Sequence, residues 1–124
     1  MNVYLAKLTI YCGEYEKTNI VLVQASSHSI ASDYAIYIES HDPKNLDWSE
    51  DPVEDMFGEF AYRCSYTETV CSSEVAVLSK HLPIFTADIS ELLQSGNYLK
   101  YLCRKPLGVI SDTEFVMSAN QKLG

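Results

Sequence analysis

Apolar residues alternate with other residues along two long stretches of this chain, and this period of two restricts the fold to one built on a sheet. Residues 3–12 predict a strand with one apolar and one mixed face, and residues 59–70 predict another. Successive side chains of a strand point to opposite faces, so one face of each is expected to lie in a core. The residues on that face are Tyr4, Ala6, Leu8 and Ile10 in the first stretch and Phe60, Tyr62, Cys64 and Tyr66 in the second.

A second strand is predicted over residues 18–24, which are rich in β-branched side chains. The short polar connection over residues 13–17 is expected to form a turn or a short strand extension, so the first two strands should pair as an antiparallel hairpin. A helix is predicted from about Ser29 to Ser40, because the preceding serines can cap its first turn and apolar residues recur at helical spacing from Ile30.

The rest of the chain predicts shorter elements. Asp51 and Pro52 are typical of a helix start, Glu54 is placed as in a capping box, and Gly58 can end that helix. The other predicted elements are a helix over 72–81, with a strand over 75–78 as the alternative, a helix over 87–95, strands over 98–103 and 107–110, and a frayed polar tail over 118–124.

These elements predict one domain over residues 1–124, with an α+β fold. We expect a two-layer sandwich in which an antiparallel sheet of about four or five strands carries helices on one face. The chain shows no signal peptide and no apolar stretch long enough to cross a membrane, which favours a cytoplasmic protein. Free and mostly buried thiols are therefore expected for the four cysteines, Cys12, Cys64, Cys71 and Cys103.

Motifs for chemistry are absent from the sequence. It has no glycine-rich phosphate loop and no Gly-x-Ser-x-Gly elbow. A zinc site drawn from Cys64, Cys71, His81 and Cys103 would lack the closely spaced ligand pairs of structural zinc sites. Acidic residues 47–55 lack the glycine and the alternate spacing of a calcium loop. We therefore expect no metal, no cofactor and no enzymatic activity.

Negative charge is concentrated in one segment of the chain. Residues 39–59 contain eight acids and a single base, Lys44, and so carry −7 of the net charge of −8. The remaining residues hold nine acids and eight bases. Such a balance argues against direct nucleic-acid or anionic membrane binding and favours basic partners.

A partner-binding surface is predicted within this acidic segment. Trp48, the only tryptophan, lies inside it, and Met56 and Phe57 follow, an arrangement typical of an aromatic anchor surrounded by charge. The alternative is a solvated loop that these apolar residues fix to the core. The residues predicted to contact a partner are Asp47, Trp48, Glu50, Asp51, Glu54, Asp55 and Glu59.

The opening strand over 3–10, the return strand over 18–24 and the serine-capped helix with Ala31 and Ala35, together with the acidic segment, resemble small accessory proteins encoded by phages and plasmids. Some acidic members of that group are anti-CRISPR proteins, which block a CRISPR effector by occupying its basic nucleic-acid channel. The resemblance implies an inhibitor of a CRISPR effector or of another nucleic-acid-binding protein. It carries no specific motif, so it transfers no functional residue.

Three classes of function follow. The first is an inhibitor or adaptor that binds a basic protein surface, with nucleic-acid mimicry as its sharpest form. The second is a small enzyme that uses the same carboxylates or a Cys/His pair, with Cys64 or Cys71 as the thiol. The third is a structural subunit, such as a homodimer formed through an exposed strand edge.

Overall fold

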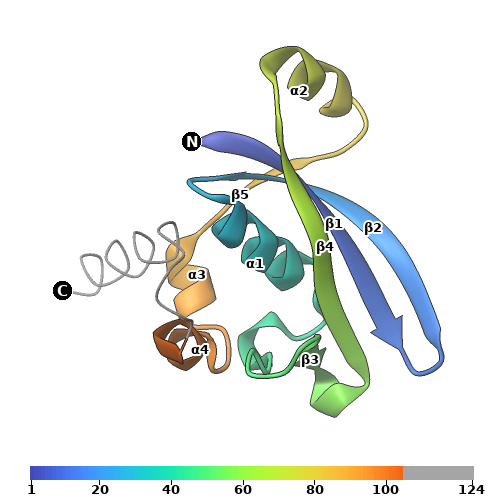
Figure 1. Ribbon diagram of the computed structural model, residues 1–124, viewed down its shortest axis with the longest axis vertical. Helices are drawn as coiled ribbons and strands as arrows, with labels where there is room; N and C mark the ends of the chain where they lie inside the picture. Colours follow the sequence, from blue (N-terminus) through green and yellow to red (C-terminus); the bar gives the residue numbers. More distant parts are fainter. Residues whose placement is uncertain (105–124) are drawn as a thin grey trace.

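The computed structural model describes residues 1–104, and its five strands form one sheet (Figure 1). The helices and strands along the chain are β1 (Asn2–Cys12), β2 (Tyr15–Ala25), α1 (His28–Glu39), β3 (Val53–Asp55), β4 (Phe60–Val70), α2 (Ser72–Leu78), β5 (Ile84–Thr86), α3 (Ile89–Leu93) and α4 (Tyr98–Arg104). The strand order is β3-β4-β1-β2-β5. The predicted α+β fold is confirmed.

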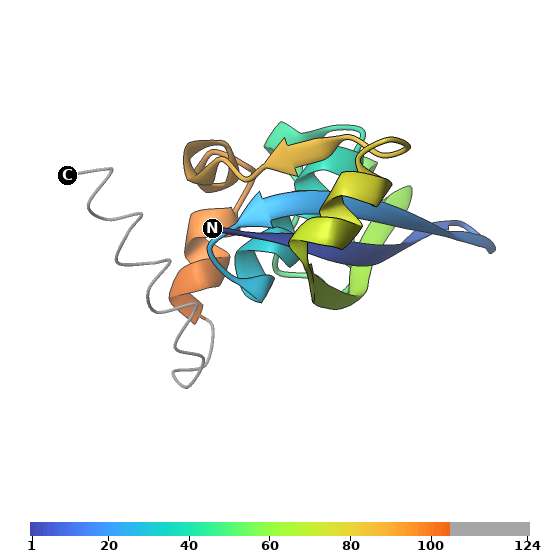
Figure 2. The same cartoon turned by 90° about the horizontal axis from the view of Figure 1, so that it is seen from above.

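The β1–β2 hairpin is the longest regular part of the sheet. Its register runs without interruption from Asn2 opposite Ala25 to Cys12 opposite Tyr15, so only two residues form the turn. Gly13 has a φ of +59°, the left-handed conformation that a two-residue hairpin turn requires and that glycine adopts at little cost. The structure contains both features predicted for residues 13–17: a turn at Gly13 and Glu14, and an extension of β2 from Tyr15. The tip of this hairpin reaches beyond the helices (Figure 2).

The sheet is mixed, which corrects the expectation of a purely antiparallel one. β4 pairs antiparallel with β1 on one side, and β3 continues the sheet beyond β4. The chain then passes through α2 to the far side of β2, where β5 pairs parallel with it. β5 was not predicted, because its three residues are too short to show a period of two.

One face of the sheet is covered by α1, which packs against all three long strands. The Ser27 hydroxyl accepts from the backbone N–H of Ile30, 3.2 Å away, and so caps the helix as its serines predicted. The core lies between α1 and the inward residues of β1, of which Ala6 and Leu8 are fully buried. α3 and α4 pack beside α1, whereas α2 lies beyond the end of the sheet and buries no residue (Figures 1 and 2).

Two predicted elements are wrong. Residues 98–103 form the helix α4 and not a strand, since Tyr98 and Leu102, four positions apart, are both buried on one helical side. Residues 51–58 form no α-helix: they hold β3 and a 3-10 turn at Met56–Gly58. Glu54 adopts an extended conformation because its backbone bonds to that of Asp47, seven positions earlier. The local capping pattern that predicted a helix contains no information about this pairing.

The helices predicted over 72–81 and 87–95 are confirmed in shorter form as α2 and α3. The predicted strand over 107–110 and the tail over 118–124 lie outside the described residues. Within residues 1–104, none of the helices has both the length and the apolar character needed to cross a membrane.

Gly96 joins α3 to α4 and cannot carry a side chain. Its φ is +48°, its N–H donates to the carbonyl of Lys44 at 2.8 Å, and an added Cβ would lie 1.9 Å from the carbonyl oxygen of Leu46. This close approach fixes the α3–α4 connection against the loop that follows α1.

Replacing Gly96 with alanine is expected to lower the free energy of unfolding by about 3 kcal/mol or more, because steric conflict with Leu46 adds to the cost of the left-handed conformation. Gly13→Ala is the matched control. Gly13 has a similar φ but no atom within 4 Å of its added Cβ, so this change should cost only about 1–2 kcal/mol. Urea unfolding of the two variants measures the difference, and equal losses would contradict the role of the close contact.

Candidate functional site

The acidic segment forms the loop that leaves α1, the edge strand β3 and the tight turn before β4. Its two halves pair with each other: the backbones of Asp47 and Glu54 exchange N–H to carbonyl bonds of 2.9 and 3.2 Å. The segment is therefore a folded substructure at one edge of the sheet. Its side chains divide into a buried set and an exposed set.

Asp55 belongs to the buried set, with a relative exposure of 1%. Its Oδ2 accepts from the backbone N–H of His41 at 2.7 Å and from the Tyr62 hydroxyl at 2.8 Å. Its Oδ1 accepts from the backbone N–H of Asp42 at 3.2 Å. Together with burial, this carboxylate raises the pKa of Tyr62. Asp55 therefore joins the start of the segment to β4 and offers no contact to a partner.

Trp48 is also buried, with a relative exposure of 1%. Its ring N–H donates to the Ser95 hydroxyl at 3.0 Å, and its backbone N–H donates to the side-chain oxygen of Asn97 at 2.6 Å. Its ring packs edge-on against Tyr98, with centroids 4.8 Å apart. Trp48 thus fixes the loop to the core, which is the structural alternative that the sequence left open, and it is removed from the predicted binding surface.

Asp47 is half-buried and anchors the same loop. Its Oδ1 accepts from the Ser49 side chain and backbone and from the Asn97 amide at 2.8 Å. Hydrogen bonds from Ser49 and then from Asn97 lower the pKa of this carboxyl below its usual value, against a smaller opposing effect of burial. Asp47 therefore stays ionised over a wider pH range than an ordinary aspartate.

The other predicted acids are available to a partner. Glu50, Asp51 and Glu59 are exposed, and Glu54 is half-buried. Asp51 is also 3.2 Å from the guanidinium of Arg63, with both side chains open to solvent, so this pair adds little to stability. The segment thus carries negative charge at the surface although Trp48 and Asp55 are buried.

Two apolar residues lie exposed at the turn before β4. Met56 and Phe57 have φ values of 55° and 59°, a conformation that costs non-glycine residues roughly 1–2 kcal/mol each. The Phe57 ring is fully exposed. Strained backbone that holds an apolar side chain out in solvent is an arrangement that clusters at ligand-contacting sites. Phe57 lies beside the predicted contacts in the sequence but is not one of them.

A cleft of about 320 Å³ lies next to this turn. Carboxylates, an amide and two apolar side chains, Met56 and Phe57, line it. The lining residues are Asp42, Asn45, Asp47, Glu54, Met56, Phe57 and Gly58. Within residues 1–104, no group of three or more His, Cys, Asp or Glu side chains is placed to hold a metal ion.

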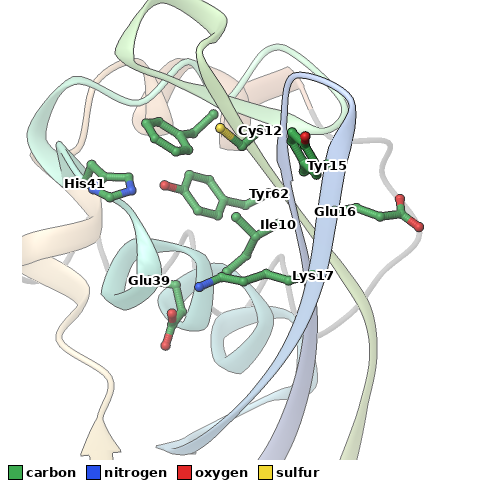
Figure 3. A pocket seen from close by; sticks show the side chains of 9 residues that line it. Ile10, Cys12, Tyr15, Glu16, Lys17, Glu39, His41 and Tyr62 are labelled. Carbon is green, nitrogen blue, oxygen red and sulfur yellow. The ribbon is translucent and has the colours of Figure 1, made fainter.

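A second hollow, of about 450 Å³, lies where α1 ends at Glu39 and the sheet continues (Figure 3). Its floor consists of two rows of residues paired across the strands. These rows are Phe60, Cys12 and Tyr15, and Tyr62, Ile10 and Lys17. Figure 3 shows Lys17 directed across the hollow toward Glu39 and Glu16 directed away. No local sequence pattern predicts this hollow, because it depends on where α1 ends relative to the longer strands.

The cysteines of the described residues are more exposed than the sequence predicts. Cys12 and Cys71 are exposed and Cys64 is half-buried, which corrects the expectation of mostly buried thiols. Burial is the main cause that raises the pKa of the Cys64 thiol, so the reactive thiolate is disfavoured. The Cys71 thiol donates to the Glu74 carboxylate at 3.0 Å beside α2, and no imidazole base is part of that contact.

Comparisons with known proteins returned no match, whether with family models, with curated proteins or with solved structures.

Removing the buried carboxylate in the Asp55→Ala variant is expected to lower the free energy of unfolding by about 3–5 kcal/mol, because three donors lose their acceptor in a buried place. The matched control within the segment is Glu59→Ala, which removes an exposed acid and should change stability by less than about 0.5 kcal/mol. Chemical denaturation compares the two, and a stable Asp55→Ala variant would show that the segment is held in another way.

Proposed function

We propose that this protein is a non-enzymatic binding module that attaches to, and inhibits, a basic protein surface. The observation that carries the proposal is Phe57, which a strained turn holds fully exposed beside a cleft lined by acidic side chains. Binding hot spots combine an aromatic anchor with surrounding polar residues that exclude water. The partner contacts are Glu50, Asp51, Glu54 and Glu59 from the predicted set, with Asp47 in the cleft and Phe57 at its rim.

The chemistry of the cleft fits a lysine or arginine side chain. Three carboxylates, those of Asp42, Asp47 and Glu54, line it, and the apolar wall of Met56 and Phe57 can pack against the aliphatic stem of such a side chain. An arginine can also stack on an exposed aromatic ring. Exposed acids around the cleft would steer a basic surface toward it.

A protein that binds nucleic acid is the partner class that best matches this surface. Such proteins carry lysine and arginine clusters that neutralise phosphates, and exposed carboxylates can occupy the same positions. Occupation of that surface would exclude nucleic acid and inhibit the partner. A CRISPR effector is one partner of this kind, in agreement with the resemblance to acidic anti-CRISPR proteins.

The test begins with affinity capture from the native host at low salt, followed by affinity measurement for the purified partner. Neutralising Glu50, Asp51, Glu54 and Glu59 together should abolish most of the binding and most of its dependence on salt. The control neutralises four other acids, Glu14, Glu39, Glu68 and Glu74, again three exposed and one half-buried, and changes the net charge equally. Equal loss of affinity in both variants would show that net charge alone causes the loss. Unchanged binding by the variant that lacks the four proposed contacts would refute the proposed surface.

The aromatic contact has its own prediction. Phe57→Ala should weaken binding by about 30-fold or more, the effect of removing a hot-spot side chain, while leaving the fold intact because the ring touches solvent. Tyr66→Ala, at another exposed aromatic residue, should leave the affinity unchanged. Calorimetric titration of the partner with each variant measures the two affinities. Equal affinities of the Phe57→Ala and Tyr66→Ala variants would show that Phe57 does not contact the partner.

A further inference from the structure

Within residues 1–104, one edge of the sheet is open along half of a strand. β5 covers β2 only at Leu22, Val23 and Gln24, and Pro83 comes immediately before β5. β2 begins at Tyr15, and every residue from Tyr15 to Ile20 is exposed. A strand edge of this kind presents unpaired backbone N–H and carbonyl groups, which are a template for another strand.

The hairpin determines which of these backbone groups point outward. In a two-residue hairpin the residues that flank the turn, Cys12 and Tyr15, bond to each other through the backbone, and the direction alternates from there along the strand. Tyr15, Lys17 and Asn19 therefore bond toward β1, while Glu16, Thr18 and Ile20 direct their N–H and carbonyl groups outward. The same alternation places the carbonyl of Gln24 outward, where it accepts from Ala87 at 2.9 Å.

The opposite edge of the sheet is interrupted by comparison. β3 covers β4 at residues 60–62, and the β1–β4 register shifts between Lys7 and Leu8, where Ser65 is the extra residue of a bulge. A bulge twists a strand and disfavours pairing with another chain. β2 has no shift in its register with β1, so it keeps the regular geometry that strand addition needs.

We propose that a second copy of this chain pairs with this edge, β2 against β2, antiparallel about a two-fold axis at Thr18. In an antiparallel pair of this kind, an outward-bonding residue of one copy must lie opposite an outward-bonding residue of the other. The allowed symmetric registers are therefore centred on successive single residues of β2. Centring the pair on Lys17 or on Glu16 would set like charges directly opposite each other. Centring it on Asn19 would place Glu16 against Leu22 of the other copy, which β5 already covers. Thr18 is the centre that avoids both conflicts.

The resulting pair joins the two sheets into one. The two Thr18 residues exchange backbone hydrogen bonds at the axis, and Glu16 pairs with Ile20 on each side of it. Lys17 of each copy then lies opposite Asn19 of the other, on the face of the sheet that α1 covers elsewhere. Lys17 thus disfavours the register centred on itself, but it does not prevent another strand from pairing with this edge.

Such a dimer goes beyond the proposed function and does not depend on it. β3 and the acidic residues around it lie at the other edge of the sheet, separated from β2 by the two strands β4 and β1. Both acidic surfaces would stay open in the dimer and face outward, so one dimer could engage two basic sites.

The test is sedimentation equilibrium of the whole chain from about 1 µM to about 1 mM, the range of affinities expected for a small interface. A concentration-dependent monomer–dimer equilibrium is expected. Thr18→Pro should abolish it, because proline removes the outward N–H at the axis and leaves the hairpin bonds to β1 in place. The control Thr18→Val keeps that N–H and should dimerise. A monomer at all concentrations, or a dimer that survives Thr18→Pro, would overturn the proposal.

Charge variants test the register without proline. Residue 19 of each copy lies opposite Lys17 of the other, so a charge introduced there acts twice per dimer. Asn19→Asp should therefore lower the dimer dissociation constant about fivefold, and Asn19→Lys should raise it by about the same factor. The tightening is opposed by the added negative charge of an already acidic chain, so net charge cannot produce it. Asn2→Asp and Asn2→Lys, at an exposed residue outside the paired stretch, should not reproduce these shifts. Equal effects at both positions would refute the Thr18-centred register.

Discussion

The candidate surface depends on one buried carboxylate. Asp55 accepts from two backbone N–H groups at the end of α1 and from the Tyr62 hydroxyl on β4. A buried carboxylate is stable only when such donors surround it, and its removal would leave these donors without their acceptor. This cluster holds the start and the end of the acidic segment together. It also sets the position from which the chain makes the strained turn at Met56 and Phe57.

The same chemistry recurs through the interior. Tyrosine hydroxyls donate to carboxylates in each case, and burial followed by the carboxylate raises the pKa of Tyr34 and Tyr37. These bonds are Tyr34 and Tyr37 to Glu91, Tyr62 to Asp55, and Tyr98 to Asp33. They join α1 to α3, β3 to β4 and α1 to α4. Several of the chain's many acids and tyrosines therefore serve the packing of the layers, and the charge available for binding is smaller than the net charge implies.

The two edges of the sheet have different chemistry. Near β3 the surface is acidic and carries an exposed aromatic ring, which suits a basic partner. At β2, Glu16, Thr18 and Ile20 direct backbone groups outward that no strand within residues 1–104 pairs with, which suits another strand. Both follow from the sheet order β3-β4-β1-β2-β5, which places β3 and β2 on opposite sides of β4 and β1. Partner binding and self-association would thus use separate surfaces.

The sequence by itself determined the β1–β2 hairpin, the capped helix α1, the strand β4 and the location of the charge, because periodicity and capping are local signals. Only the tertiary structure decided that Trp48 and Asp55 lie inside while Phe57 lies outside. Trp48 bonds to Ser95 and Asp55 to His41, which are 47 and 14 positions away in the chain. Local propensity contains no information about such partners. For the same reason it did not predict the parallel pairing of β5, and it predicted a strand where α4 forms. Burial of a polar or aromatic group depends on which distant donors reach it, and the packing of the layers determines that.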